Sequence, residues 1–169
     1  MGTSEHRWAS SRLLIRTMPS DAVNAIVDGR RLEDWAEDYP ADGDVFIANG
    51  LHRGDITQSG DGGGNALWGH HQIVEISSNL VVGGLGFHAP PHDGVAEIGY
   101  GVIPSRRGQG YATEAVMTLV AAAWDLPEVL GIIAHAEHHN VASQRVLEKA
   151  GFHLVGEGDN DLFRIDRPR

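Results

Sequence analysis

A glycine-rich turn is the part of this sequence best suited to binding an anion. The stretch Arg107-Gly-Gln-Gly-Tyr-Ala112 follows the apolar run 98–103 and precedes apolar residues at the three- and four-residue spacing of an amphipathic helix. The first N–H groups of a helix have no intrahelical partner and lie at the positive end of its dipole. Glycines remove the Cβ atoms that would keep an anion away. The pattern predicts a diphosphate cradle, or else a tight turn without a ligand.

A second pattern, Asn-x-x-Ser-x-x-Val-Leu-Glu-Lys-x-Gly-Phe, begins at Asn140. Asn140 is a good helix N-cap, and Ser143 follows one helical turn later. Gly151 suits the left-handed conformation that often follows the end of a helix. Each residue has a structural explanation when taken alone, so it is the combination of residues that points to a function.

In this order, the two patterns resemble motifs A and B of the GNAT superfamily (Gcn5-related N-acetyltransferases) and look most like its ribosomal-protein-modifying, RimJ/RimL-like branch. Gly108 and Gly110 match motif A, Gln/Arg-x-x-Gly-x-Gly/Ala, whereas its first position falls on Ser105. The strong resemblance covers residues 81–156. It implies acetyl-CoA as cosubstrate, no metal, and a cofactor-binding set made of Val102, Ile103, Arg107, Gly108, Gln109, Gly110, Tyr111, Ala112, Asn140 and Ser143.

Acetyl transfer to an amine needs a group that accepts the amine's proton and a donor for the departing thiolate. Glu97 is the predicted base, because it precedes the glycine turn on a strand where the histone-acetylating branch has a glutamate. A water-facing glutamate is the alternative interpretation, and His135 is the alternative base. Leu147 stands where many GNAT enzymes have a tyrosine that acts as the general acid. Ser143 resembles the serine of the ribosomal-protein branch and is the predicted acid, although a serine at this place can also serve only the helix cap.

The elements expected around these residues form one domain, 1–169, with a flexible tail at 1–11. Strands are expected at 13–16, 72–76, 80–88, 95–103, 129–136, 152–156 and 162–165, and helices at 22–27, 45–52, 112–123 and 140–150, with a further acidic helix within 30–44 and a loop at 59–64. This is a mixed α/β arrangement. The resemblance implies the GNAT fold, in which a mostly antiparallel sheet is splayed at the acetyl-CoA site and flanked by helices.

Composition narrows the classes of partner. The formal charge of −10 argues against binding a nucleic-acid backbone, and the absence of cysteine excludes disulfides and cysteine nucleophiles. No apolar run reaches the roughly 20 residues that a membrane span needs, and no signal-peptide pattern is present, so we expect a cytoplasmic location and no membrane partner.

The acceptor implied is a primary amine, attacking acetyl-CoA directly in a ternary complex. A protein or peptide N-terminus, and a small cationic amine such as an aminoglycoside or polyamine, both remain open. The acidic segment 30–44 is hypothesised to attract cations at the acceptor mouth through Glu37 and Asp38. A non-catalytic acyl-CoA-binding sensor module is an alternative from another class, and a homodimer through the C-terminal strands is open as well.

Overall fold

A computed structural model describes residues 7–58 and 65–169, so the expected loop at 59–64 lies outside the described residues, as do residues 1–6. The elements follow the order β1 (Arg7–Ala9), β2 (Leu13–Thr17), α1 (Ser20–Val27), α2 (Asp42–Arg53), β3 (His70–Glu75), β4 (Leu80–Phe87), β5 (Val95–Val102), η1 (Pro104–Arg106, a 3-10 helix), α3 (Tyr111–Trp124), β6 (Gly131–Glu137), α4 (Val141–Lys149), β7 (His153–Gly156) and β8 (Asn160–Asp166).

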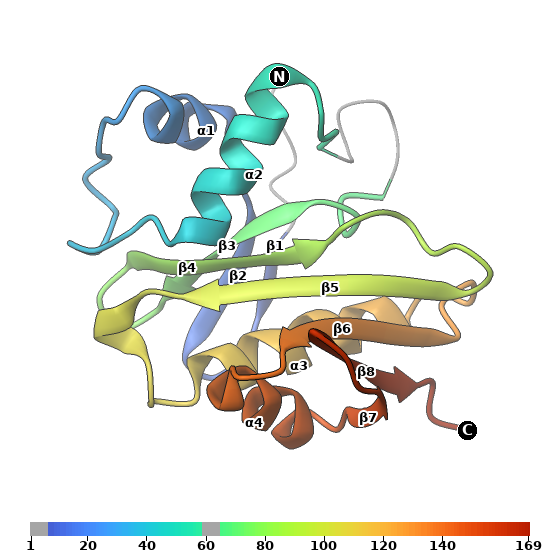
Figure 1. Cartoon of the computed structure of the whole chain (residues 1–169). Helices are drawn as coiled ribbons and strands as arrows, with labels where there is room; N and C mark the ends of the chain where they lie inside the picture. Colours follow the sequence, from blue (N-terminus) through green and yellow to red (C-terminus); the bar gives the residue numbers. More distant parts are fainter. Residues whose placement is uncertain (1–6, 59–64) are drawn as a thin grey trace.

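The eight strands of the described chain form one sheet in the order β1-β2-β3-β4-β5-β6-β8-β7. Figure 1 shows α1 and α2 on one face of this sheet and α3 and α4 on the other. Because side chains alternate along a strand, the odd-numbered residues of β5 face α2 and the even-numbered ones face α3 and α4. The predicted mixed α/β fold with a mostly antiparallel sheet is confirmed.

The sheet opens between β5 and β6, its only parallel neighbours in the described chain. These strands pair from Val95 with Gly131 to Glu97 with Ile133. Beyond Glu97, β5 continues to pair with β4 on its other side, whereas β6 pairs with β8. The half of β5 that leads to the glycine turn therefore has an unpaired edge within the described chain. This is the predicted splay.

Apolar packing fixes α3 against the sheet below this opening. Ala115, Leu119 and Ala123 are fully buried on one face of the helix, at the predicted spacing. Full burial of a leucine side chain contributes about 1.5–3 kcal/mol. The core therefore determines where the first turn of α3 lies relative to the end of β5.

The expected helix within 30–44 is wrong for residues 30–41, which form turns and extended backbone. The side chain of Arg31 donates hydrogen bonds to the carbonyl oxygens of Trp35, Ala36 and Tyr39, which a helix would have used in its own ladder. Trp35 also forms a parallel bridge with Val81 of β4. These tertiary contacts outweigh the helical spacing of the two aromatic residues, which are both buried as core.

Residues 7–11, the described part of the tail expected at 1–11, contain a strand. Arg7–Ala9 forms the edge strand β1, which pairs antiparallel with β2. The ring of Trp8 packs edge-on against His71 at a centroid distance of 4.9 Å. The polar composition of this segment gave no indication of an edge strand. Pairing with β2 and the contact between Trp8 and His71 help to hold this strand in place.

Candidate active site

The glycine turn lies at the N-terminus of α3, as predicted. Gly108 and Gly110 have φ angles of 74° and 82°, in the left-handed region that favours glycine. A Cβ atom added to Gly108 would have no protein atom within 4 Å. Gly110 is the N-cap of α3, and no side chain of the described residues caps this end. Open space and uncapped N–H groups fit a diphosphate, so the residues present suit the implied acetyl-CoA.

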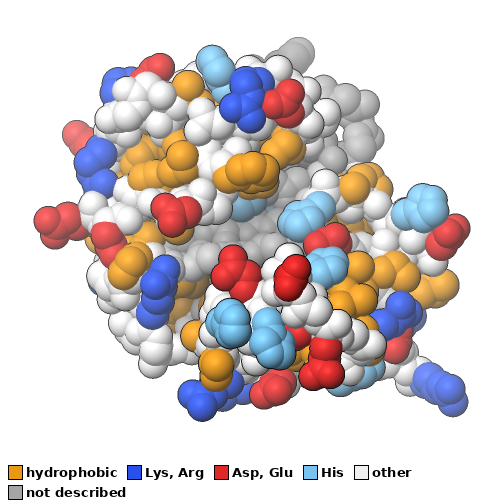
Figure 2. All heavy atoms as spheres, viewed as in Figure 1, with side chains coloured by type: hydrophobic (Ala, Val, Ile, Leu, Met, Phe, Trp, Pro, Cys, Tyr) orange, Lys and Arg blue, Asp and Glu red, His pale blue; other side chains and the backbone are white. Residues whose placement is uncertain are grey.

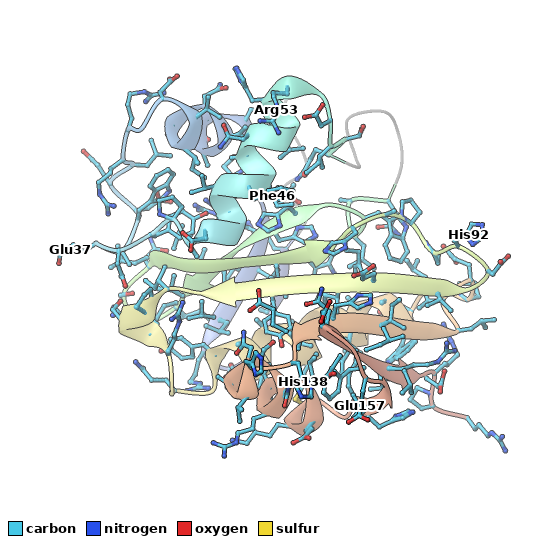
Figure 3. All side chains as sticks on the ribbon, in the orientation of Figure 1. Glu37, Phe46, Arg53, His92, His138 and Glu157 are labelled. Carbon is cyan, nitrogen blue, oxygen red and sulfur yellow. The ribbon has the colours of Figure 1, made fainter. Side chains whose placement is uncertain are left out.

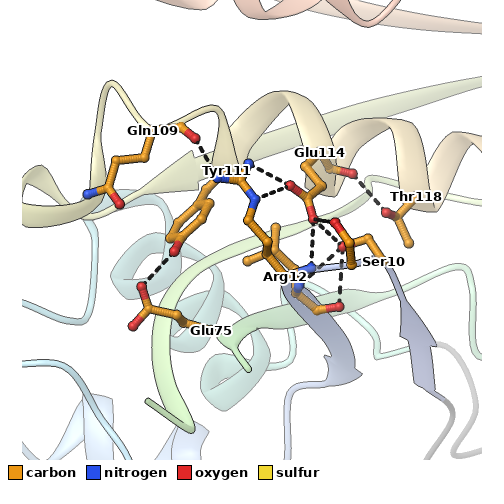
Figure 4. A network of polar contacts seen from close by, with 9 residues as sticks. Ser10, Arg12, Glu75, Gln109, Tyr111, Glu114 and Thr118 are labelled. Carbon is orange, nitrogen blue, oxygen red and sulfur yellow. Dashed lines mark hydrogen bonds and ion pairs between the residues drawn. The ribbon is translucent and has the colours of Figure 1, made fainter. Parts of the chain in front are cut away.

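A network of hydrogen bonds and an ion pair ties this turn to the first strands, and Figure 4 shows it around Arg12. The guanidinium of Arg12 donates to the backbone oxygen of Gln109 at 2.9 Å and to Glu114 at 2.7 Å. The hydroxyl of Ser10 also donates to Glu114, at 2.6 Å. Burial opposes ionisation of Glu114, but these hydrogen bonds together hold its pKa below the ordinary value. Sequence spacing gave no signal for Arg12, which lies far from motif A in the chain.

A buried carboxylate, Glu75, holds the other side of the turn. Its oxygen Oε1 accepts hydrogen bonds from the Tyr111 hydroxyl at 2.7 Å and from Arg106 at 3.0 Å, and Ser78 donates to Oε2. The Tyr111 side chain is therefore turned into the protein, and the cofactor-binding role expected for this residue stays a prediction. Burial alone would raise the pKa of Glu75, yet the bonds from Ser78, Tyr111 and Arg106 outweigh it and lower that pKa below 4.5.

Glu75→Gln is expected to lower the free energy of unfolding by about 2–3 kcal/mol at neutral pH, because it breaks charge-assisted hydrogen bonds at a buried site. A carboxyl with a lowered pKa stabilises the fold above its unfolded-state pKa and loses that contribution as pH falls through its folded-state pKa. The difference between the two proteins should thus shrink below pH 4.5. Urea titrations at several pH values measure it, with the exposed Glu128→Gln as control. Equal stability of Glu75→Gln and the parent chain at neutral pH would contradict this account.

The segment around Ser105 is held by Asp38. The backbone N–H and the hydroxyl of Ser105 donate to the two oxygens of Asp38 at 2.8 Å and 2.7 Å. These bonds, the side-chain bond first, hold the pKa of Asp38 below its ordinary value. Asp38 is thus engaged at the start of η1, and Figure 3 shows Glu37 projecting outward at the edge of the molecule. The hypothesis that Glu37 and Asp38 attract cations at the acceptor mouth stays a prediction.

The two candidate bases meet at the opening between β5 and β6. His135 Nδ1 lies 2.7 Å from Glu97 Oε1, and His88 Nδ1 lies 3.5 Å from the same oxygen. The Glu97 side chain is 32% exposed and the His135 side chain 43%. Glu97 and His135, the two bases that the sequence left as alternatives, therefore form one hydrogen-bonded pair at the surface of the sheet. Figure 2 shows histidine and carboxylate side chains gathered over the middle of this face.

The predicted acid lies on the opposite side of the sheet from this pair. Asn140 caps α4 as predicted, because its Oδ1 accepts the N–H of Ser143 at 3.0 Å. The Ser143 hydroxyl lies 2.7 Å from the hydroxyl of Tyr100, a residue of β5 that sequence reasoning missed. Burial raises the pKa of Tyr100, opposed by the bond to Ser143, so its hydroxyl stays protonated. Position 147 of α4 holds a leucine, so the tyrosine hydroxyl that lies beside Ser143 comes from Tyr100 of β5.

The remaining members of the predicted set lie between the end of β5 and the first turn of α3. Val102 and Ile103 are buried at the end of β5. The side chain of Arg107 donates a hydrogen bond to the carbonyl oxygen of Val102 at 3.1 Å, so this oxygen already has a partner within the protein. Gln109 is exposed and Ala112 is partly buried in the first turn of α3.

Within 7–58 and 65–169 there is no cluster of three or more histidine or carboxylate side chains arranged to hold a metal ion. None of the helices in the same ranges combines the length and the apolar character needed to cross a bilayer.

Comparison with known proteins places this geometry in a family. Residues 12–153 match the acetyltransferase (GNAT) domain family. An uncharacterized N-acetyltransferase of Bacillus subtilis (strain 168), YjdG, is 41% identical over 83 residues. That alignment covers 48% of this chain and about half, 49%, of the relative.

Solved structures share the fold at lower identity. RimJ of Mycobacterium smegmatis, in complex with CoA-disulfide, has a TM-score of 0.66 at 21% identity, covering 97% of this chain and 88% of that one. RimL, a ribosomal L7/L12 alpha-N-protein acetyltransferase in complex with coenzyme A, has a TM-score of 0.66 at 18% identity, covering 95% and 98%. With the family match spanning most of its length, the chain belongs to the acetyltransferase (GNAT) domain family, whose members use acetyl-CoA for N-acetylation.

Proposed function

We propose that this chain transfers the acetyl group of acetyl-CoA to a primary amine, the N-terminal amine of a protein or peptide. The observation that carries the proposal is the Glu97–His135 pair at the point where β5 and β6 separate, on the strand that leads to the uncapped start of α3. The similar fold of RimL, which acts on an alpha-N position of a ribosomal protein, supports this acceptor class. The net charge of −10 favours a cationic acceptor.

In the proposed mechanism the base and the hydrogen-bond donor to the leaving group lie on opposite faces of the sheet. Acetyl-CoA, when bound, supplies an acyl carbon activated as a thioester. The Gly108–Gly110 turn would hold the diphosphate, and the unpaired edge of β5 would meet the amide groups of the pantetheine arm. Both histidines contact Oε1 of Glu97, which leaves its Oε2 to accept the proton of the attacking amine.

Proton balance requires a donor on the leaving side. The new bond joins the amine nitrogen to the acetyl carbon, the carbon–sulfur bond breaks, and the thiolate takes a proton. Ser143 is the proposed hydrogen-bond donor: its hydroxyl stabilises the departing thiolate and keeps its own proton, and water supplies the proton that the thiolate takes up. Either hydroxyl of the 2.7 Å contact between Tyr100 and Ser143 can be the donor, and the Tyr100 hydroxyl also lies 3.1 Å from the carbonyl oxygen of Ser143. In the proposed mechanism Tyr100 donates to the Ser143 hydroxyl oxygen, so that the serine hydrogen is directed at the sulfur. Tyr100 is therefore a positioning residue in this mechanism.

Ser143→Ala is expected to lower kcat by about tenfold, the value of one hydrogen bond made to the leaving group, with little change in the KM for acetyl-CoA. Tyr100→Phe should lower kcat less, by about fivefold. Because Tyr100 acts through Ser143, the double variant should be no slower than Ser143→Ala. Steady-state kinetics of the three variants measure this. Multiplicative losses would show that the two hydroxyls act independently, and a loss under twofold in Ser143→Ala would reject the donor role.

The proposed function is tested by CoA release with three sets of amines: peptides with free N-termini, aminoglycosides and polyamines. Release well above background with peptides alone is the expected result. Release with an aminoglycoside or polyamine instead would move the acceptor class to small cationic amines. Tight binding of acetyl-CoA without release by any amine would favour a sensor module.

A further inference from the structure

A pocket lies beside the Glu97–His135 pair, on the face of the sheet covered by α2. Its volume is about 350 Å³. Its apolar walls include Phe46, Ile47 and Ile56, and its floor includes the backbone of Gly86, Gly99 and Gly101. Figure 3 labels Phe46 on α2, where its side chain is 69% exposed. This size is at the low end for ligand pockets and leaves room for one large side chain.

The one carboxylate that lines the pocket is already paired. Asp44 is 2% exposed, its Oδ1 lies 2.9 Å from His70 Nε2, and its Oδ2 accepts the N–H of Ala41 at 3.3 Å. A Cβ atom at Gly84 would lie 1.9 Å from Asp44 Oδ1, so the floor glycine makes space for this pair. A second ammonium group entering the pocket would lose its hydration without gaining an accessible counter-charge, which is costly. The pocket therefore disfavours polyamines and aminoglycosides.

The pocket also continues into the site of the proposed base. His88 lines the pocket and lies 3.5 Å from Glu97. Gly99 and Gly101 follow Glu97 on the same face of β5. In an amino acid, the side chain and the α-amine are attached to the same carbon. An acceptor whose amine meets Glu97 can thus direct its first side chain into the pocket.

We propose that this pocket binds the side chain of the acceptor's first residue and selects peptides that begin with a large apolar residue. This inference rests on the proposed function. It names the substrate class of that site: N-termini such as Leu or Phe, ahead of Ala, and ahead of Lys, whose side chain carries a second charge.

The test uses four peptides that differ only in the first residue, which is Phe, Leu, Ala or Lys. Gly101→Ala narrows the pocket from its floor, where an added Cβ meets no protein atom within 4 Å. We expect it to lower kcat/KM for the Phe and Leu peptides by about tenfold, the effect of one misfitted methyl group, and to change the Ala peptide less than twofold. Phe46→Ala removes an exposed wall and should lower kcat/KM for the same two peptides several-fold.

Leu154→Ala, an exposed apolar change on β7, is the matched control and should change none of these values. Acetyl-CoA affinity and thermal unfolding confirm that each variant is folded. A parent enzyme that acetylates all four peptides equally, or prefers Lys, overturns this inference and leaves the proposed function intact. Equal losses on all four peptides in both pocket variants overturn it as well. Absence of transfer to every peptide, with acetyl-CoA bound, overturns both.

Discussion

Glu97→Gln is expected to lower kcat/KM for acetyl transfer by a factor of about 10²–10⁴, the usual contribution of a positioned general base. Glutamine has nearly the same shape and can still accept a hydrogen bond from His135, whose Nδ1 lies 2.7 Å from the carboxylate. It cannot accept the amine's proton at working pH. The affinity for acetyl-CoA should stay unchanged, because the glycine turn is on a different element. Stopped assays that follow CoA formation measure the rates.

His135→Ala separates the two members of the pair. If Glu97 is the base and His135 orients it, the single histidine variant should lose less than Glu97→Gln, and the double variant should lose no more than Glu97→Gln. The exposed Glu157→Gln, which removes the same charge at the turn before β8, is the control. A Glu97→Gln enzyme with an unchanged rate would remove Glu97 from the mechanism. A larger loss in His135→Ala would transfer the base role to the histidine.

Gly108→Ala is expected to weaken acetyl-CoA binding by about 10–100-fold, which corresponds to about 1.4–2.8 kcal/mol. The residue has φ of 74°, and its added Cβ would meet no protein atom within 4 Å. The methyl group would therefore project into the space proposed for the diphosphate. The strained left-handed backbone should itself cost about 1–2 kcal/mol of stability.

Gly29→Ala provides a matched control for this prediction. Gly29 has φ of 67° and, like Gly108, has no protein atom within 4 Å of an added Cβ, but it follows α1 instead of preceding α3. The two variants should lose similar stability in urea titrations, whereas only Gly108→Ala should lose affinity in calorimetric titrations with acetyl-CoA. Equal affinities in both variants would contradict the cradle at α3.

The local part of this site was predictable because its signals lie within single elements. Glycines 108 and 110 at a strand-to-helix turn, and Asn140 at a helix start, are patterns of a few neighbouring residues, and both turns lie where they were predicted. Two motifs in the expected order then predicted the fold. The opening between β5 and β6 followed from that resemblance and is found where the paired registers separate.

What the sequence could not predict depends on residues far apart in the chain. Glu97 and His135 were competing candidates until the parallel register of β5 and β6 brought them together. Tyr100 reads as an apolar strand residue, and only packing of α4 on the sheet brings Ser143 to its hydroxyl. The segment 30–41 was misread because Arg31 and Val81 take up backbone groups that helical spacing assigns to a local ladder.

The most direct test of the central claim compares CoA formation from acetyl-CoA with two forms of one peptide, bearing either a free or a blocked N-terminus. The peptide begins with Leu and contains no lysine, so the α-amine is its sole primary amine. The account predicts CoA formation with the free peptide, one acetyl group on its N-terminus, and only background release with the blocked form. Equal release with both forms, or with neither, would contradict N-terminal acetyl transfer at this site.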